Sequence, residues 1–257
     1  MVAVGFKNSL VILGGLAEVL KDSIVEFKKR RPSLEDISTQ IINVGVESLP
    51  LIVITAISSG FVMTLQFGLG IEKYGGKPYV PKVMALATFL ELAPVFTALM
   101  CSARVGAGMA SEIGSMKVTQ QIDAIRALGA SPYQKIYLPR IIACLITFPV
   151  LTVIMALLAL VATSIIAYAE LNLNFLFTYQ KIVTTVSSWE FFCTAIKPFG
   201  FALSVALPAC YFGMNVTDGT KGVGRATTMA VVTGSMLIFI IDYIMTKIYW
   251  LLYPYGG

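Results

Sequence analysis

The sequence contains no histidine and little charge of either sign. Charged residues make up 13% of the 257 positions and hydrophobic residues 57%, whereas soluble domains are roughly 25% charged. The absence of histidine removes the most common general base and metal ligand, which argues against an enzyme. A surface this apolar would not stay monomeric in water, so we expect the lipid bilayer to be the solvent.

Cysteine is also sparse, and the basic residues have an ordinary distribution for a membrane protein. The four cysteines lie in or beside apolar stretches without CxxC spacing, which indicates small core residues rather than a disulfide framework or a metal site: Cys101, Cys144, Cys193 and Cys210. The net charge of +5 comes from residues between apolar runs. It therefore gives no indication of nucleic-acid binding.

The N-terminal segment Met1–Leu20 is mildly apolar but is interrupted by polar residues, and no small-residue cleavage site follows it. This pattern favours an amphipathic helix in the membrane interface over a signal peptide. The helix should end in the basic run at 28–31, before Pro32. We therefore divide the chain into an interfacial helix with a basic linker, residues 1–39, and one membrane domain, residues 40–257.

Five stretches have the ~20 apolar residues that a helix needs to cross a bilayer. They are about Val44–Phe67, Val83–Ala103, Ile141–Tyr168, Phe191–Val216 and Ala226–Leu252. The sequence therefore predicts an all-α, polytopic membrane protein with five transmembrane helices. Lys and Arg are concentrated on the side of the N-terminus, so we expect that end in the cytoplasm and the C-terminus outside.

The longest connection on the predicted cytoplasmic side runs from Arg104 to Arg140. It has no helix breaker between Met109 and Leu128, and Gly129 then provides a typical helix stop. This helix is too polar to cross the bilayer, so we expect it beneath the membrane against a partner. An ordinary amphipathic interfacial helix fits the composition equally well.

The glycine-rich run Gly219–Gly224 is not a nucleotide site. It lacks the Gly-Lys-Ser/Thr ending of a phosphate-binding loop and does not follow a strand. We interpret it as a tight cytoplasmic turn between the fourth and fifth spans. Any ATP hydrolysis must then occur on another chain.

Three charged residues fall at similar depth within the predicted spans: Glu91, Lys197 and Asp242. Ionisable groups inside a membrane are costly and usually functional, and they need partners. We favour an ion pair between Glu91 and Lys197. In the alternative, Lys197 extends to the interface and Asp242 bonds to a neighbouring hydroxyl group.

Four large, adaptable side chains form one helical stripe at the outer end of the first span: Met63, Phe67, Ile71 and Tyr74. Their spacing fits internal packing. In a lipid transporter the same stripe would line a cavity for acyl chains, beside Glu91, Lys197 and Asp242. The spacing does not distinguish these alternatives.

Several runs of the sequence form a specific pattern. Residues 91–99 read ELAPVFTAL, 103–108 ARVGAG, 110–124 ASEIGSMKVTQQIDA, 138–140 LPR and 222–228 GVGRATT. These runs strongly resemble the MlaE/YrbE permease family, the membrane subunits of ABC transporters associated with MCE (mammalian cell entry) proteins. The run from Glu112 to Asp123 is not a generic membrane pattern. The resemblance covers roughly residues 40–250.

The resemblance implies a homodimer of five-span permeases in the inner membrane, each with an N-terminal interfacial helix. Two cytoplasmic ATPases would use the ATP and dock on a coupling helix at about 109–128, which contains Glu112, Gly114, Gln121 and Asp123. An MCE-domain hexamer would sit on the outer face, phospholipid would occupy the dimer interface, and this chain itself would bind no cofactor. A small cytoplasmic accessory subunit is an open possibility.

The transporter would move phospholipid between the inner membrane and the MCE carrier, for outer-membrane lipid asymmetry or envelope lipid supply. We expect the first and fifth spans at the dimer interface, where glycines allow close approach: Gly60, Gly68, Gly70 and Gly234. Two positions depart from the family pattern. Gln120 replaces a usual Glu in the coupling helix, and Leu90 replaces an Arg that many relatives have before Glu91.

Two other functional classes compete with a permease. A secondary transporter, or another multi-span lipid-handling protein without an ATPase, would need coupling-ion sites and often has two related halves; neither is visible. A membrane-embedded lipid enzyme would need a catalytic constellation, but the sequence has no histidine and only isolated carboxylates. Co-purification of an ATPase would separate these classes.

Overall fold

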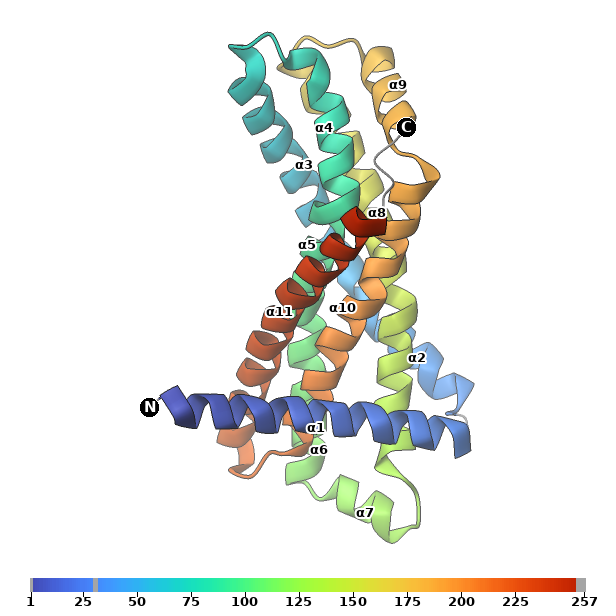
Figure 1. The fold of residues 1–257 in the computed structure, drawn as a ribbon. Coiled ribbons are helices and arrows are strands. Elements are labelled where there is room, and N and C mark those ends of the chain that lie inside the picture. Colours follow the sequence, from blue (N-terminus) through green and yellow to red (C-terminus); the bar gives the residue numbers. More distant parts are fainter. Residues whose placement is uncertain (1, 30–31, 253–257) are drawn as a thin grey trace. The chain divides into compact units, whose positions relative to one another are not determined.

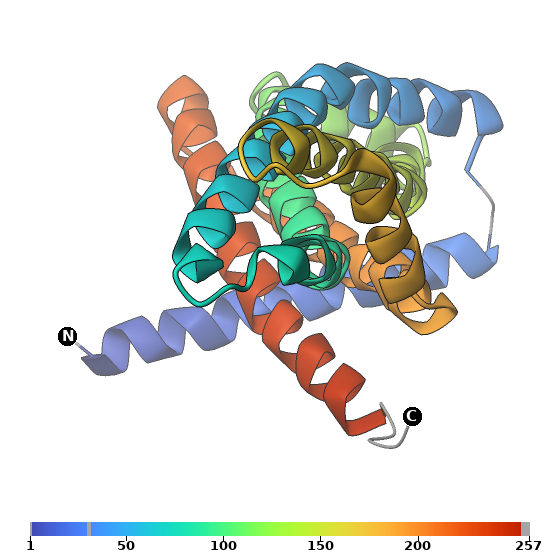
Figure 2. The same cartoon turned by 90° about the horizontal axis from the view of Figure 1, so that it is seen from above.

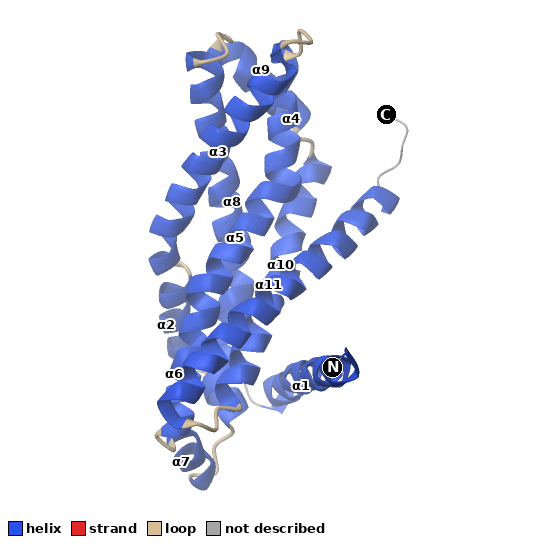
Figure 3. Ribbon diagram, turned by 90° about the vertical axis from the view of Figure 1, so that its left-hand side faces the viewer, coloured by secondary structure: helices blue, strands red, loops and turns tan. Residues whose placement is uncertain are grey.

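A computed structural model describes residues 2–29 and 32–252 of the chain. Every regular element among these residues is a helix and none is a strand (Figure 3), which confirms the predicted all-α class. The first helix is α1 (Val2–Lys29). Met1, Arg30 and Arg31, which belong to the predicted interfacial helix and basic run, lie outside the described residues.

Five helical segments among the described residues are long and apolar enough to span a membrane, as predicted. They are Leu34–Glu72, Lys77–Val118, Tyr133–Ala169, Ser188–Met214 and Gly219–Leu252. All but the fourth extend well beyond the predicted apolar runs, because polar residues at their ends continue the helices. The second span shows this most clearly, since Gly106 and Gly108 lie inside its helix rather than opening a loop.

Most spans consist of several consecutive elements. The first contains α2 (Leu34–Val44), the short η1 (Val46–Ser48) and α3 (Leu49–Glu72). The second contains η2 (Lys77–Tyr79), α4 (Val80–Ala87), η3 (Thr88–Leu92), α5 (Ala93–Cys101), η4 (Ser102–Gly106) and α6 (Ala107–Val118). The third contains η5 (Tyr133–Tyr137) and α8 (Leu138–Ala169), and the last two are α10 (Ser188–Met214) and α11 (Gly219–Leu252). Two short helices lie between spans, α7 (Gln121–Ala127) and α9 (Phe175–Thr185).

The helices contribute to two compact units, which we describe separately. The α1 unit comprises residues 2–47 without 30 and 31, 101–147 and 201–239. The α9 unit comprises residues 48–100, 148–200 and 240–252. The long helices α8, α10 and α11 each contribute residues to both.

In the α1 unit, α1 runs crosswise to α6 and to the part of α10 that belongs to this unit (Figure 1), and Figure 2 shows α1 along its length from above. Gly15 permits this packing, because a Cβ atom there would lie 2.1 Å from the ring of Tyr211. The Asp22 carboxylate of α1 lies near the hydroxyl group of Tyr133 in η5. A close apolar contact and a polar link therefore both hold α1 in place.

The α9 unit is organised around α3, α4 and α8. Its tightest helix contact is at Gly60 of α3, where a Cβ atom would lie 2.5 Å from the carbonyl oxygen of Ala159 in α8. One turn further along, the hydroxyl group of Thr64 donates to that of Thr163 at 3.0 Å. The small residues of α3 thus serve packing within the chain.

The helix α9 was not predicted, although its sequence carries a recognisable start. The Asn174 side chain accepts a hydrogen bond from the backbone N–H of Leu176 at 2.8 Å, which is an N-terminal cap. Thr178 and Ile182, four residues apart, form its buried face, and the helix packs against α4. The connection between the third and fourth spans is therefore ordered structure.

The prediction of one continuous helix from Met109 to Leu128 was wrong. The chain breaks between α6 and α7 at Gln120, whose φ of 58° lies in the left-handed region. Just before the break, the Thr119 hydroxyl group donates a hydrogen bond to the Ser115 carbonyl oxygen at 2.9 Å. The predicted stop is confirmed, because Gly129 has a φ of 75° just after α7.

The run Gly219–Gly224 is also different from the prediction. It forms the first turns of α11, and the turn lies before it, in the four residues after α10. Of the four cysteines, Cys101, Cys144 and Cys210 are free and buried, which confirms their core role. The side chain of Cys193 lies outside the described part.

The glycines expected at a dimer interface mostly pack within the chain. Like Gly60, Gly68 faces a neighbouring side chain, with Leu171 2.5 Å from a Cβ atom built on it, and Gly234 faces Ser102 at 3.1 Å. Only a Cβ atom on Gly70, of the four, would meet nothing within 4 Å. At three of the four positions, close packing within the chain therefore explains the glycine.

Candidate functional site

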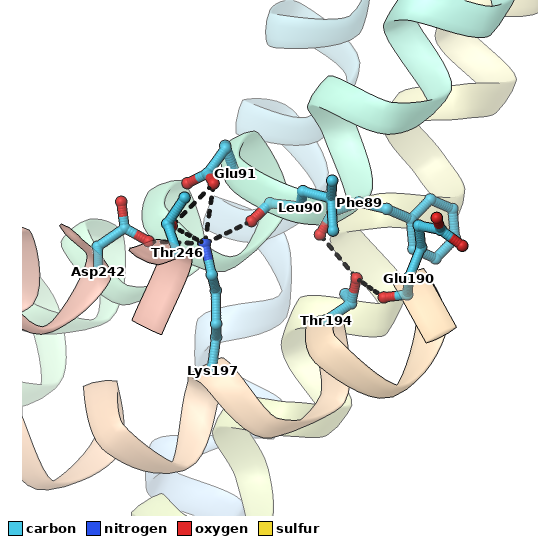
Figure 4. Close-up of polar contacts among 8 residues, drawn as sticks. All are labelled: Phe89, Leu90, Glu91, Glu190, Thr194, Lys197, Asp242 and Thr246. Atoms are coloured by element: carbon cyan, nitrogen blue, oxygen red, sulfur yellow. Dashed lines mark hydrogen bonds and ion pairs between the residues drawn. The ribbon is translucent and has the colours of Figure 1, made fainter. Parts of the chain in front are cut away.

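The predicted intramembrane charges meet in the α9 unit, around the ammonium group of Lys197 on α10 (Figure 4). The Lys197 Nζ atom lies 3.0 Å from Glu91 Oε1 and 3.0 Å from Asp242 Oδ1. It also donates to the hydroxyl oxygen of Thr246 on α11 at 2.8 Å, and that hydroxyl group donates to Glu91 Oε1 at 3.0 Å. The expected Glu91–Lys197 pair is confirmed, but it is part of a three-charge cluster that includes Asp242.

A proline explains why α10 side chains contact this part of the second span. Pro94 has no N–H group, so the carbonyls one turn earlier lose their helical partner, and the wider π-helical turn η3 forms there. The Leu90 carbonyl accepts a bond from Lys197 Nζ at 2.7 Å, and the Phe89 carbonyl accepts one from the Thr194 hydroxyl at 2.7 Å. Lys197 and Thr194 thus satisfy buried backbone oxygens that would otherwise be unpaired.

The three charged side chains differ in exposure. The Lys197 side chain is 5% exposed, that of Asp242 18% and that of Glu91 40%. The alternative in which Lys197 extends towards the interface is therefore wrong. With all three groups ionised, the cluster carries one net negative charge, and Glu91 is its most accessible member.

The start of α10 is fixed close to this cluster. The Ser187 backbone N–H and hydroxyl group both bond to the Glu190 carboxylate, in a capping-box arrangement. The Trp189 ring stacks on Phe192 of the same helix and on Tyr249 of α11, with centroid distances of 6.0 and 6.4 Å. These contacts align α10 with the end of α11 that carries Asp242.

An apolar cavity of about 140 Å³ lies between α10 and α11 and shares Lys197 with the cluster. Its other lining residues are Trp189, Phe192, Ile196, Met245, Ile248, Tyr249 and Leu252. The sequence analysis missed this cavity. The spacing of Met245, Ile248, Tyr249 and Leu252 along one helix face was the signal that could have indicated it.

The four residues of the predicted stripe at the end of the first span do not form one surface. Met63 and Ile71 are partly buried and pack against the core residues Val80, Met84 and Leu171. Phe67 is 39% and Tyr74 87% exposed, and Tyr74 lies in the turn after α3. None of these four side chains lines the apolar cavity. The packing interpretation therefore holds for Met63 and Ile71.

The residues expected to couple to an ATPase all lie in the α1 unit. Glu112 on α6 accepts a bond from Arg140 on α8 at 2.9 Å, and the Arg140 side chain is only 10% exposed. Asp123 on α7 contacts Lys117 at 3.2 Å, across the break at Gln120. Both carboxylates remain about half exposed.

The other two positions expected to couple to an ATPase are Gly114 and Gln121, and both have local structural roles in α6 and α7. Gly114 faces Val216 and Val223, which would lie 3.1 and 3.4 Å from a Cβ atom. Gln121 is the first residue of α7. The four positions thus surround the bend between α6 and α7 but do not form one continuous helix face.

Comparison with known proteins identifies relatives across most of the chain. A probable ABC transporter permease from Rickettsia typhi is 35% identical over 218 residues, which cover 82% of each chain. One from Synechocystis sp. is 34% identical over 228 residues, or 89% of this chain and 84% of the relative. The chloroplastic protein TRIGALACTOSYLDIACYLGLYCEROL 1 of Arabidopsis thaliana is 30% identical over 210 residues, or 82% of this chain and 60% of the relative.

The profile of the family described as Permease MlaE matches residues 37–248, from α2 to near the end of α11. That range includes the charged cluster and both helices of the α6–α7 bend. Together with the permease relatives, this match places the chain in the MlaE permease family.

Proposed function

We propose that this chain is the membrane subunit of an ABC transporter that moves phospholipid between the inner membrane and an MCE-domain carrier. Such transport would maintain outer-membrane lipid asymmetry or supply lipid to the envelope. The observation that carries the proposal is the Lys197 cluster beside an apolar cavity within the spans. A polar anchor next to an apolar cleft suits an amphiphile with a head group and chains.

A lipid substrate has support from one relative. The Arabidopsis protein bears the name of a glycerolipid, trigalactosyldiacylglycerol. The site here differs from the predicted one, because α10 and α11 line the cavity in place of the α3 stripe. In this proposal the cluster of Glu91, Lys197 and Asp242 anchors the head group through its accessible carboxylate oxygens, and the α10–α11 cavity accepts part of an acyl chain.

The partner ATPases would hydrolyse the ATP and dock at the α6–α7 bend, on the cytoplasmic side with the N-terminus. Glu112 and Asp123 offer half-exposed carboxylates there, and buried Arg140 ties α6 to α8. Motion at the bend would reach the spans through that ion pair. This chain itself would have no catalytic role and bind no cofactor.

A second copy of the chain would complete the substrate site. Helix α11 exposes a row of large apolar residues: Met236, Phe239, Ile240, Tyr243 and Ile244. Closed two-fold dimers are the most common homo-oligomers, and this face of α11 would form the contact. An MCE-domain hexamer on the outer face, and a small cytoplasmic accessory subunit in some systems, would complete the assembly.

The test is purification of the tagged chain from its own host, followed by reconstitution. We expect an ATPase with a phosphate-binding loop to co-purify, and ATP-dependent transfer of labelled phospholipid from the reconstituted complex. If no ATPase co-purified and a proton or sodium gradient drove transfer, the alternative would hold: a secondary transporter or another lipid-handling protein without an ATPase.

A further inference from the structure

The charged cluster in the α9 unit offers more hydrogen-bond acceptors than donors, which is unusual for a site that would contact phospholipid. The ammonium group of Lys197 has three N–H bonds but four oxygen atoms within 3.0 Å: Leu90 O, Glu91 Oε1, Asp242 Oδ1 and Thr246 Oγ1. Its side chain is only 5% exposed. Lys197 therefore has no N–H group left to bind a phosphate.

The groups that remain available are carboxylate oxygens. Lys197 contacts one oxygen of Glu91 and one of Asp242, and within the described residues no side chain bonds to the second oxygen of either group (Figure 4). The Thr246 hydroxyl group donates to Glu91, so its hydrogen is already used. An incoming molecule meets hydrogen-bond acceptors and one net negative charge.

This electrostatic balance distinguishes between lipid head groups. In a low-dielectric layer an uncompensated negative charge repels an anion and attracts a cation more strongly than in water. A primary ammonium also brings N–H donors to the two free oxygens, and charge-assisted hydrogen bonds are the strong ones. A trimethylammonium group has the charge but no donor.

The adjoining apolar cavity indicates that the ligand carries an apolar chain as well as a cationic end. Lys197 lines both the cluster and the apolar space between α10 and α11, where the other lining residues include Trp189, Phe192 and Ile248. A ligand with its cationic end at Glu91 can thus place an apolar chain beside these side chains. A hydrated metal ion or a free amine would leave that cavity unfilled.

We propose that this site selects phospholipids whose head group bears a primary ammonium, with Glu91 as the main specificity-determining residue and Asp242 as the second. The proposal rests on the proposed lipid-transport function and deepens it. Phosphatidylethanolamine has the required chemistry, whereas phosphatidylglycerol lacks the cation and phosphatidylcholine lacks the N–H donors.

The experiment is a competition for binding, measured by native mass spectrometry on the permease purified with its ATPase. The probes are dioleoyl phosphatidylethanolamine, phosphatidylcholine and phosphatidylglycerol, with glycerophosphoethanolamine as a head group without chains. We expect about tenfold preference for phosphatidylethanolamine over phosphatidylglycerol, the factor for one charge-assisted hydrogen bond. Phosphatidylcholine should fall between them, and glycerophosphoethanolamine should compete weakly.

Two conservative variants test the assigned residues. Glu91→Gln and Asp242→Asn each remove one negative charge and leave Lys197 a carboxylate partner, so we expect the preference to fall towards unity while phosphatidylglycerol binding is kept or rises. Glu170→Gln, at an exposed carboxylate after α8, should keep the wild-type preference. A purely structural role would instead weaken all three lipids equally.

The outcomes separate this inference from the proposed function. Equal binding of the three lipids by the wild type would overturn the head-group assignment and leave lipid transport standing. Unchanged preference in both variants would overturn the roles of Glu91 and Asp242. If no phospholipid bound and none was transferred with ATP, the proposed function itself would fail.

Discussion

The two regions that carry the charges we propose to be functional are built differently. In the α9 unit one buried lysine is shared by two carboxylates and a backbone carbonyl. In the α1 unit, Arg140–Glu112 and Lys117–Asp123 pair each cation with a carboxylate that is about half exposed. Burial makes the first arrangement costly to disturb, whereas solvent limits the stability of the second. The first suits a fixed site inside the membrane, and the second suits a surface that moves with a partner.

The largest expected effect is that of Lys197→Met. It removes the only cation of the cluster, leaves two carboxylates facing each other, and strands the Leu90 carbonyl. We expect the loss of stability to be on the order of 3–5 kcal/mol, the range for breaking a buried ion pair. Thermal unfolding in detergent measures it. If the melting temperature stayed at the wild-type value, the cluster would not be the buried anchor described here.

A packing change in each region extends the comparison. Gly60→Leu in the α9 unit would drive a side chain into the Ala159 carbonyl, so we expect a loss of ~1–3 kcal/mol from overpacking. Gly108→Ala in the α1 unit meets nothing within 4 Å and should be neutral or slightly stabilising, since alanine favours helix. The same unfolding assay compares them. Equal destabilisation by both would contradict the assigned contacts.

Charge reversal in the α1 unit should affect coupling far more than stability. Glu112→Lys places a second cation beside the buried guanidinium group of Arg140, but residue 112 is 56% exposed, so solvent can screen the new charge and the loss of stability should be smaller than that of Lys197→Met. We expect membrane insertion to be intact and transport-coupled ATP turnover to be lost. Exchange of the two charges, with Glu112→Arg and Arg140→Glu, tests the pair directly. Full transport by a Glu112→Lys, Asp123→Lys double variant would rule out coupling at this bend.

The smallest effect is expected at Asp123 alone. Asp123→Asn leaves Lys117 and Arg126 without their exposed partner, which typically changes stability by only 0.2–1 kcal/mol. Coupled ATP turnover should fall while the melting temperature hardly moves. A drop in melting temperature as large as that of Lys197→Met would remove the distinction between the two regions.

The sequence predicted features that depend on local pattern. Long apolar runs located all five spans, and Gly129 located the end of α7, because a glycine stop acts within one turn. Matched depth along helices brought Glu91, Lys197 and Asp242 together. In each case the physical cause is contained in a few neighbouring residues or in helix geometry.

Features that depend on side-chain contacts between distant segments were missed. The break at Gln120 has no glycine or proline to indicate it, because a non-glycine residue adopts the left-handed conformation there. The cavity between α10 and α11 needs two helices to be placed together, and half of the α3 stripe was already used in packing on α4. Pro94 did indicate from the sequence that the Phe89 and Leu90 carbonyls need donors outside their own helix. A search for such donors would have identified Thr194.

The most direct test of the central claim uses the triple variant Lys197→Met, Glu91→Gln, Asp242→Asn, reconstituted with the partner ATPase and assayed for ATP-driven phospholipid transfer. Removing all three charges leaves none stranded, so we expect stability to recover most of what Lys197→Met loses, and ATPase docking to be retained. Transfer should nevertheless be lost, because the polar anchor for the head group is gone. Transfer at the wild-type rate by this stable variant would contradict the assignment of the Lys197 cluster as the substrate site.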